Sequence, residues 1–433
     1  MLHPRCAVLK QTTRRHVIAV VARAAAGIAI AAGAAMVPGC AAAGDEDFDF
    51  LLLGDTHLDQ IAHHDMAWLT REKPEVIPEC RAYCRITKET TPLLFGQLRR
   101  QIESNSRIRF VSQLGDLTEG LAGTPELARQ HHADAVAFVR NARLGVPFLL
   151  TKGNHDRAGP GAPESFDARL RPFIAGELGA LYGRRIGDDA AGARPRTFAL
   201  QRPHACYAHS RGNTLLVHFD GFSNESLDWL EQILTGRREK HLILFIHYPL
   251  VPYSPRSTWC LYAQPSKAKE RTRLLNLLGE HRAIVLSAHL HDFGIVVRRT
   301  DRGSFVQVAT CSVLPSLPAK PARRRSGLEN YGGDIVEIDP EIKAPGPANT
   351  KQKRREFLEA ERPFICHYEY AIAPGYALIS VRDDGVGAQF FCGLDSTPWR
   401  EVNLTGLLPE DERQTPHALQ SANEGGGKVI GPR

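Results

Sequence analysis

Short apolar runs that each end in a polar block recur between residues 48 and 291 of the chain. Short runs rich in Val, Ile, Leu and Phe predict buried strands. The runs that precede polar blocks cover residues 48–53, 108–114, 146–150, 241–246 and 283–286. Because ligands gather at the carboxyl ends of strands in open α/β sheets, we expect these polar blocks to meet at one edge.

Helical periodicity separates the predicted strands. Apolar positions three and four residues apart predict helices over residues 92–102, 125–144, 226–234 and 267–278. Strands that alternate with helices predict an α/β (α+β) fold. We expect residues 48–312 to form the main domain of this fold.

The sequence changes character after residue 312. Residues 313–365 are rich in Pro, Lys and Arg and have no sustained period, so we predict an irregular excursion. Residues 366–405 contain further apolar runs that predict late strands completing the domain, with a hairpin turn at Asp383-Asp384-Gly385. Residues 409–433 are polar and Gly-rich, which predicts a flexible tail.

Residues 1–40 have the order of an export signal: a basic start, an Ala-rich apolar stretch and then small residues. The pair Arg14-Arg15 resembles the twin-arginine signal. The segment that ends at Cys40 resembles a lipobox, which would make Cys40 the lipid-bearing residue. Cleavage near Ala43 and an uncleaved anchor remain alternatives. We expect an exported protein of the periplasm or cell envelope, attached to the membrane if Cys40 is lipidated.

The charge balance argues against one class of partner. The formal net charge is +6, but residues 1–39 contain five basic residues and no acid, which leaves about +1 for the rest. A surface that tracks nucleic-acid phosphates is therefore not expected. The oligomeric state is not indicated by the sequence.

Seven of the nine cysteines lie beyond residue 40, so they cannot all pair with one another. Cys80 and Cys84 are close enough in sequence for a local disulfide. Their spacing is a weak zinc signal without a second cysteine pair, and we interpret the two residues as structural.

The polar blocks together supply a complete set of oxygen and nitrogen donors. One Gly-Asp pair or one histidine means little alone, but these blocks occur in one order and each follows an apolar run. Imidazole and carboxylate donors suit Mn, Fe, Zn or Co. A hydrolase with two metal ions roughly 3.5–4 Å apart needs a carboxylate that bridges them. The blocks are Asp55-x-His57, Gly115-Asp116, Gly153-Asn154-His155-Asp156, His247 and His289-x-His291.

In residue type and order these blocks resemble those of the calcineurin-like metallophosphoesterases, whose pattern is D-x-H, G-D, G-N-H-D, a lone H and G-H-x-H. The resemblance covers residues 48–311. Within the family, the sequence is most similar in its overall pattern to bacterial cyclic-nucleotide-phosphodiesterase-like members. It implies a four-layer sandwich of two mixed β-sheets flanked by helices. It also implies two divalent or transition metal ions at the strand ends.

The resemblance implies a role for each block residue. Asp116 would bridge the two ions, and a bridging hydroxide would attack phosphorus. His155 would stabilise charge on the phosphate and protonate the leaving group. One ion would be bound by Asp55, His57 and His291, and the other by Asn154, His247 and His289.

Two positions depart from the family pattern. Ala288 stands where a Gly is expected before the first histidine of the last block, and a positive φ there would strain the turn. Glu119 stands where the purple acid phosphatases have a Tyr, three residues after the bridging Asp. A purple Fe(III) site is therefore not expected.

The resemblance implies a metal-dependent hydrolase that cleaves a phosphomonoester or a small phosphodiester. A nuclease of the same superfamily remains an alternative, and so does an exported metal-binding or surface lipoprotein without catalysis. The sequence leaves the substrate and the identity of the metals open. Asp59, His63 and His64 follow the first block and either line a substrate pocket or are exposed loop residues without a role.

Overall fold

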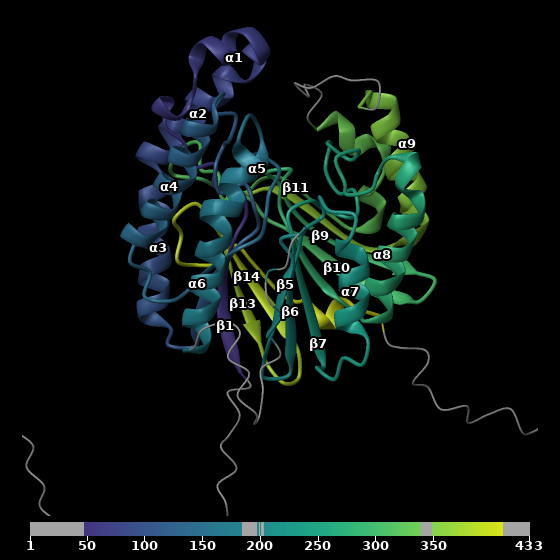
Figure 1. Ribbon diagram of the computed structural model, residues 1–433. Helices are drawn as coiled ribbons and strands as arrows, with labels where there is room; N and C mark the ends of the chain where they lie inside the picture. The colour runs from purple at the N-terminus through teal and green to yellow at the C-terminus, as the bar shows by residue number, and fades with distance from the viewer. Residues whose placement is uncertain (1–46, 184–196, 199, 201–202, 339–348, 410–433) are drawn as a thin grey trace, which may run out of the picture. The chain divides into compact units, whose positions relative to one another are not determined.

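The computed structural model describes residues 47–183, 197–198, 200, 203–338 and 349–409. Within these ranges the chain forms two mixed β-sheets that pack face to face, with helices on their outer faces (Figure 1). The predicted sandwich of two mixed sheets flanked by helices is confirmed. The predicted export signal with Cys40, and residues 410–433 of the predicted tail, lie outside the described residues.

The first sheet has six strands and contains the N-terminal strand at an inner position. The three strands that come first in sequence run parallel, and the three late strands are added to them antiparallel. Their order across the sheet is β15 (Arg400–Asn403), β14 (Val386–Cys392), β13 (Gly375–Val381), β1 (Phe48–Leu53), β2 (Ile108–Gln113) and β3 (Phe148–Leu150).

The second sheet has nine strands and is mixed as well. Its central strands pair in parallel, and hairpins extend it on both sides. The order is β11 (Ala322–Ser326), β12 (Ile365–Ile372), β9 (Phe293–Thr300), β10 (Gly303–Ala309), β8 (Ile284–Ser287), β7 (His241–Ile246), β6 (Thr214–Phe219), β5 (Tyr207–Arg211) and β4 (Thr197–Phe198).

An apolar layer between the sheets forms the larger hydrophobic core. Phe50 of β1 stacks on Phe110 of β2 with ring centroids 4.8 Å apart, and it contacts Phe245 of the opposite sheet at 5.5 Å. Strands β1 and β7 are buried at every position, which explains why their sequences read as nearly continuous apolar runs. Side chains at neighbouring strand ends of the two sheets can therefore meet.

Helices cover the outer face of each sheet (Figure 1). The first sheet is covered by α3 (Thr91–Ser104), α4 (Pro125–Asn141) and α6 (Arg171–Tyr182). The second is covered by α7 (Ser226–Leu234), α8 (Ala268–Glu280) and α9 (Lys351–Glu361). The connections contain α1 (Met66–Glu72), α2 (Ile77–Glu89) and α5 (Ala162–Ser165). Among the described helices, none has the length and apolar character needed to cross a membrane.

The region after residue 312 differs in part from expectation. The late strands are present, but β12 joins the second sheet whereas β13 and β14 join the first. Residues 313–365 are not irregular throughout, because they contain β11 and α9. Helix α9 buries only Arg354, Leu358 and Glu361, so its sequence shows almost no apolar period.

All seven cysteines of the described residues are free thiols, so Cys80 and Cys84 do not form the local disulfide that their spacing allows. The thiols of Cys80 and Cys84 each face a carboxylate instead. Cys80 Sγ lies 3.9 Å from Glu119 Oε1, and Cys84 Sγ lies 3.4 Å from Asp59 Oδ2. Burial raises the pKa of both thiols, and the neighbouring carboxylates raise it further.

A buried ion-pair cluster fixes the end of α9 against the second sheet. Glu361 accepts a hydrogen bond from Arg271 of α8 at 2.8 Å and one from Arg298 of β9 at 2.7 Å. Burial alone would raise the pKa of Glu361, but the two guanidinium groups outweigh burial and lower this pKa.

Replacing Glu361 with Gln should destabilise the protein by about 1–3 kcal/mol at pH 7, because two buried guanidinium groups lose their charged acceptor. The folded-state pKa lies below the ordinary value of 4.5, so this contribution is present above pH 4.5 and is lost as pH falls through the folded-state pKa. Denaturant unfolding of both proteins at pH 7 and at decreasing pH measures the difference. A difference that stays constant would contradict the assignment, and the exposed Glu356→Gln is the control.

Candidate metal centre

The five polar blocks meet where neighbouring strands of the two sheets end. Asp55, Asp116 and Asn154 follow β1, β2 and β3, which are adjacent in the first sheet. His247 and His289 follow β7 and β8, which are adjacent in the second sheet. The structure thus brings together side chains from both sheets, as expected from the sequence pattern.

One group of donors contains Asp55, His57 and His291. The Nε2 atoms of His57 and His291 lie 3.1 Å apart, and His291 Nε2 lies 3.6 Å from Asp55 Oδ1. His57 donates Nδ1–H to Glu119 Oε2 at 2.7 Å, so in the neutral ring Nε2 carries a lone pair. Carboxylate and imidazole lone pairs therefore converge from three residues.

A second group surrounds His247. Its Nδ1 donates to the Leu114 carbonyl oxygen at 2.9 Å, which leaves Nε2 as the bare nitrogen of the neutral ring. The distances from this Nε2 are 2.9 Å to Asn154 Oδ1, 3.1 Å to Asp116 Oδ2 and 3.2 Å to His289 Nδ1. Four residues thus present oxygen or nitrogen donors to one small volume.

Asp116 lies between the two groups. Its Oδ2 is 3.1 Å from His247 Nε2 and 3.9 Å from His57 Nε2. Its Oδ1 accepts a hydrogen bond from the backbone N–H of His155 at 2.7 Å. A carboxylate held in this position can contact two cations at once.

The electrostatics of the two groups favour added positive charge. Burial alone would raise the pKa of Asp55, but His291 and His247 outweigh burial and lower this pKa to about 2. Burial alone would lower the pKa of His247, but Asp116 and Asp55 outweigh burial and raise it to about 9. Ionised carboxylates beside converging imidazoles fit bound cations, and the mixture of nitrogen and oxygen donors fits transition metals.

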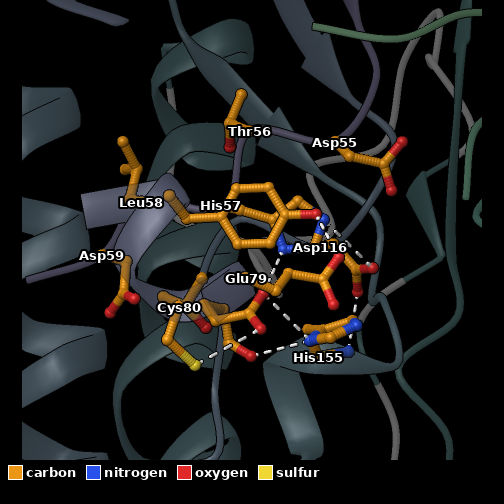
Figure 2. Close-up of polar contacts among 12 residues, drawn as sticks. Asp55, Thr56, His57, Leu58, Asp59, Glu79, Cys80, Asp116 and His155 are labelled. Atoms are coloured by element: carbon orange, nitrogen blue, oxygen red, sulfur yellow. Dashed lines mark hydrogen bonds and ion pairs between the residues drawn. The ribbon is translucent and has the colours of Figure 1, made fainter. Parts of the chain in front are cut away.

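His155 lies beside Asp116, and the dashed lines of Figure 2 mark its contacts. Its Nδ1 donates to the Glu119 carbonyl oxygen at 2.8 Å, which leaves Nε2 available to a ligand. Burial alone would lower the pKa of His155, but the carboxylates of Glu119 and Asp116 outweigh burial and raise this pKa well above its ordinary value.

Glu119 is the main residue of this site to which the sequence assigned no role. Its fully buried carboxylate accepts the hydrogen bond from His57 Nδ1 and lies 3.2 Å from His155 Nδ1. A carboxylate on the outer nitrogen of a metal-binding histidine fixes the ring and strengthens its donor atom. The only sequence signal for Glu119 was its position three residues after Asp116, where the purple acid phosphatases have a Tyr. That position showed the absence of the Tyr but gave Glu119 no role.

Four block residues adopt left-handed backbone conformations that residues other than Gly rarely take. Their φ angles are 44° for His57, 54° for Asp116, 72° for His289 and 59° for His291. Such conformations persist where the surrounding structure enforces them, and they concentrate at functional sites. Ala288 has no positive φ, so the strain expected from the missing Gly does not arise there.

Close packing fixes the loop that carries Asn154 and His155. A Cβ at Gly153 would lie 2.0 Å from Asp116 N and 2.2 Å from Asp116 Oδ1, so only Gly fits. Asp156 accepts hydrogen bonds from the backbone N–H groups of Gly153 at 2.9 Å and Asp116 at 3.0 Å. Asp156 therefore holds two loops together and does not join the donor groups.

A sequence profile described as calcineurin-like phosphoesterase matches residues 48–293, which is more than half of the chain. The chain belongs to the calcineurin-like phosphoesterase family. Its described residues include donor groups of the kind that a dinuclear metal centre requires. No curated protein sequence matches the chain.

Several solved structures resemble this phosphoesterase at low identity. The purple acid phosphatase PPD1 of yellow lupin (Lupinus luteus) shares 12% identity at a TM-score of 0.43, over 82% of this chain and 53% of that chain. The phosphoesterase thus spans about half the length of the lupin protein. A dimetal phosphatase from Danio rerio shares 15% identity at a TM-score of 0.45, over 82% of this chain and 98% of that chain. PhoD shares 12% identity at a TM-score of 0.45, over 83% and 69%.

Glu119→Gln should lower metal affinity or phosphoesterase activity about 10–100-fold, because the His57 ring loses the carboxylate that orients it and strengthens its donor nitrogen. Metal content after dialysis, together with the rate at saturating metal, measures the two effects. Glu126→Gln, on the exposed face of α4, is the matched control. Metal content and rate equal to those of the wild type would show that the Glu119–His57 hydrogen bond has no such role.

Proposed function

We propose that this phosphoesterase cleaves a phosphomonoester or a small phosphodiester with two metal ions bound at the strand ends. The observation that carries the proposal is the position of the Asp116 carboxylate between the two donor groups. In this assignment Asp116 would be a ligand of both ions. Asp55, His57 and His291 would hold the first ion, and Asn154, His247 and His289 would hold the second.

Two such ions would supply a metal-bound water of lowered pKa as the nucleophile and positive charge for the phosphate oxygens. The chain contributes the remaining functions. In the protein without metal, the histidines beside Asp55 and Asp116 outweigh burial and lower the pKa of both carboxyls, so both are available as anionic ligands. His155, whose pKa is raised, holds a proton at Nε2 that can stabilise the developing charge and pass to the leaving oxygen.

A cavity of about 340 Å³ next to the 153–156 block supports a small substrate. Arg157 lines it and lies over the ring of Phe222, with the guanidinium carbon 5.3 Å from the ring centroid. The Phe222 ring in turn packs on Tyr248, which packs on His289 with centroids 4.2 Å apart. The lining combines the cationic Lys152 and Arg157 with the acidic Asp167 and Glu225, and the aromatic rings of Phe166 and Phe222 can contact an apolar leaving group.

The metals are proposed to be Mn, Fe, Zn or Co, which accept imidazole, carboxylate and amide oxygen donors. Glu119 hydrogen-bonds His57 at the position where purple acid phosphatases have a Tyr, which supports a site without the purple Fe(III) chromophore. The order of residue types in segment 1–40 supports export to the periplasm or cell envelope, with lipid attachment at Cys40.

Purified protein supplied with Mn²⁺, Fe²⁺, Zn²⁺ or Co²⁺ should hydrolyse p-nitrophenyl phosphate or its bis-ester, and His155→Ala should lower kcat about 10²–10⁴-fold. The variant should keep its metals, because His155 is in neither proposed ligand set. Steady-state kinetics and elemental analysis of the same samples measure both quantities, with His367→Ala on β12 as control. A fully metal-loaded wild type that hydrolyses no phosphoester would refute the function and favour a metal-binding protein without catalysis.

A further inference from the structure

The cavity of about 340 Å³ next to the 153–156 block is lined by charged side chains, most of which have polar partners. Lys152 donates to Asp220 Oδ2 at 2.9 Å, and Asp167 Oδ1 accepts a hydrogen bond from Arg171 Nε at 3.0 Å. These contacts engage the charges of two lining residues. The charged lining residues are Lys152, Arg157, Asp167 and Glu225.

The guanidinium of Arg157 has no such partner. Within the ranges that the structure describes, this exposed group makes no hydrogen bond and no ion pair, not even with the acidic residues of the lining. Glu225 instead accepts a hydrogen bond from Ser223 Oγ. A guanidinium has five N–H donors and no acceptor, so those of Arg157 remain available to an anion.

An aromatic ring restricts the position of this guanidinium. The guanidinium carbon of Arg157 lies 5.3 Å from the ring centroid of Phe222, and Lys152 Nζ lies 5.7 Å from the same centroid. A cation over the face of an aromatic ring is attracted by the ring. The contact with Phe222 therefore restrains Arg157 while its N–H donors stay unpaired, which reduces the entropy cost of binding a ligand there.

The place of Arg157 in the chain relates it to the candidate metal centre. It ends the 3₁₀ turn His155–Arg157, whose first residue has its Nε2 available to a ligand. Phe222 also contacts Tyr248, with ring centroids 5.4 Å apart, and the Tyr248 ring lies 4.2 Å from that of His289. A leaving group that takes its proton from His155 would therefore lie beside the cavity that contains Arg157.

The residues that follow the first block do not contribute to this cavity. Asp59, His63 and His64 are absent from its lining, and they are only 1%, 3% and 6% exposed. His64 Nε2 lies 2.9 Å from both oxygens of Asp59, and His63 Nε2 lies 3.0 Å from Asp134 Oδ2. They are therefore not exposed loop residues, and their hydrogen bonds stabilise the turn after β1.

We propose that Arg157 is a specificity-determining residue, which binds a second anionic group on the leaving group of the substrate. The inference rests on the proposed function and adds a substrate class to it: phosphoesters whose leaving group carries a carboxylate or another phosphate. An anion beside the guanidinium gains charge-assisted hydrogen bonds, and it can engage two N–H groups at once. A neutral leaving group leaves these donors to water, so it binds less tightly. The second anion takes no part in the bond cleavage.

Carboxyphenyl phosphate and carbamoylphenyl phosphate test this class, because the two esters have nearly the same shape and differ by one negative charge. The meta and para isomers are measured with metal-loaded, full-length protein. The wild type hydrolyses at least one carboxyphenyl isomer with a kcat/KM about 10-fold above that of its carbamoyl counterpart, mostly through KM. In Arg157→Gln this ratio falls to about 1.

Arg140→Gln is the matched control. Arg140 is also an exposed arginine over a phenylalanine ring, with its guanidinium carbon 5.9 Å from the centroid of Phe173, but it lines a different cavity. This variant keeps the ratio of the wild type.

Calorimetric binding of the corresponding phosphonates, which are not hydrolysed, measures the same preference without turnover. The wild type binds carboxyphenyl phosphonate about 10-fold more tightly than carbamoylphenyl phosphonate, and Arg157→Gln binds both equally. No preference in either isomer, or a preference that Arg157→Gln retains, overturns the proposal. A binding preference that depends on Arg157, in a metal-loaded protein that hydrolyses no phosphoester, would refute only the proposed function.

Discussion

Carboxylates and imidazole nitrogens from both sheets are concentrated at the strand ends, and the rest of the structure depends on how they are held there. Without positive charge near them, the buried carboxylates of Asp55 and Asp116 would repel each other. Hydrogen bonds to the backbone and to other side chains hold the donors in place despite this repulsion. His247 is fixed by the Leu114 carbonyl and His57 by Glu119, and in each case the nitrogen that remains bare faces the donor groups.

The apolar core and the strained backbone also hold the donor side chains in place. Phe50 and Phe245 join the two sheets, so that the ends of β1 and β2 lie next to those of β7 and β8. Left-handed conformations at His57, Asp116, His289 and His291 then turn the chain sharply after each strand. Gly153 lets the next loop approach Asp116 without a Cβ in between. Packing and backbone conformation together thus set the positions of the donors.

The sequence predicted those parts of the fold whose pattern is local. β1 and β7 are continuous apolar runs, and α7 has a clear helical period, so their bounds agree with the prediction. Helix α2 buries only Cys80, Tyr83 and Ile86, and α9 is mainly polar, so neither gave a readable period. The hairpin β9–β10 was missed because its first strand ends in charged residues and follows the histidine block directly.

The sequence predicted which residues gather at the candidate site, but it did not predict the contacts that orient them. The order of the blocks singled out the residues that the structure brings together, because their chemistry and spacing are visible in the sequence. The contacts that orient them depend on the fold: Glu119 reaches His57 from a separate loop, and the Leu114 carbonyl after β2 reaches His247 after β7. Such contacts link residues far apart in sequence, and no local pattern encodes them.

Anomalous diffraction from crystals of the metal-loaded protein tests the central claim most directly. The account predicts two ions roughly 3.5–4 Å apart at the strand ends, with the Asp116 carboxylate between them. One ion should contact Asp55, His57 and His291, and the other Asn154, His247 and His289. A single ion at the strand ends, or ions bound only elsewhere in the chain, would contradict it.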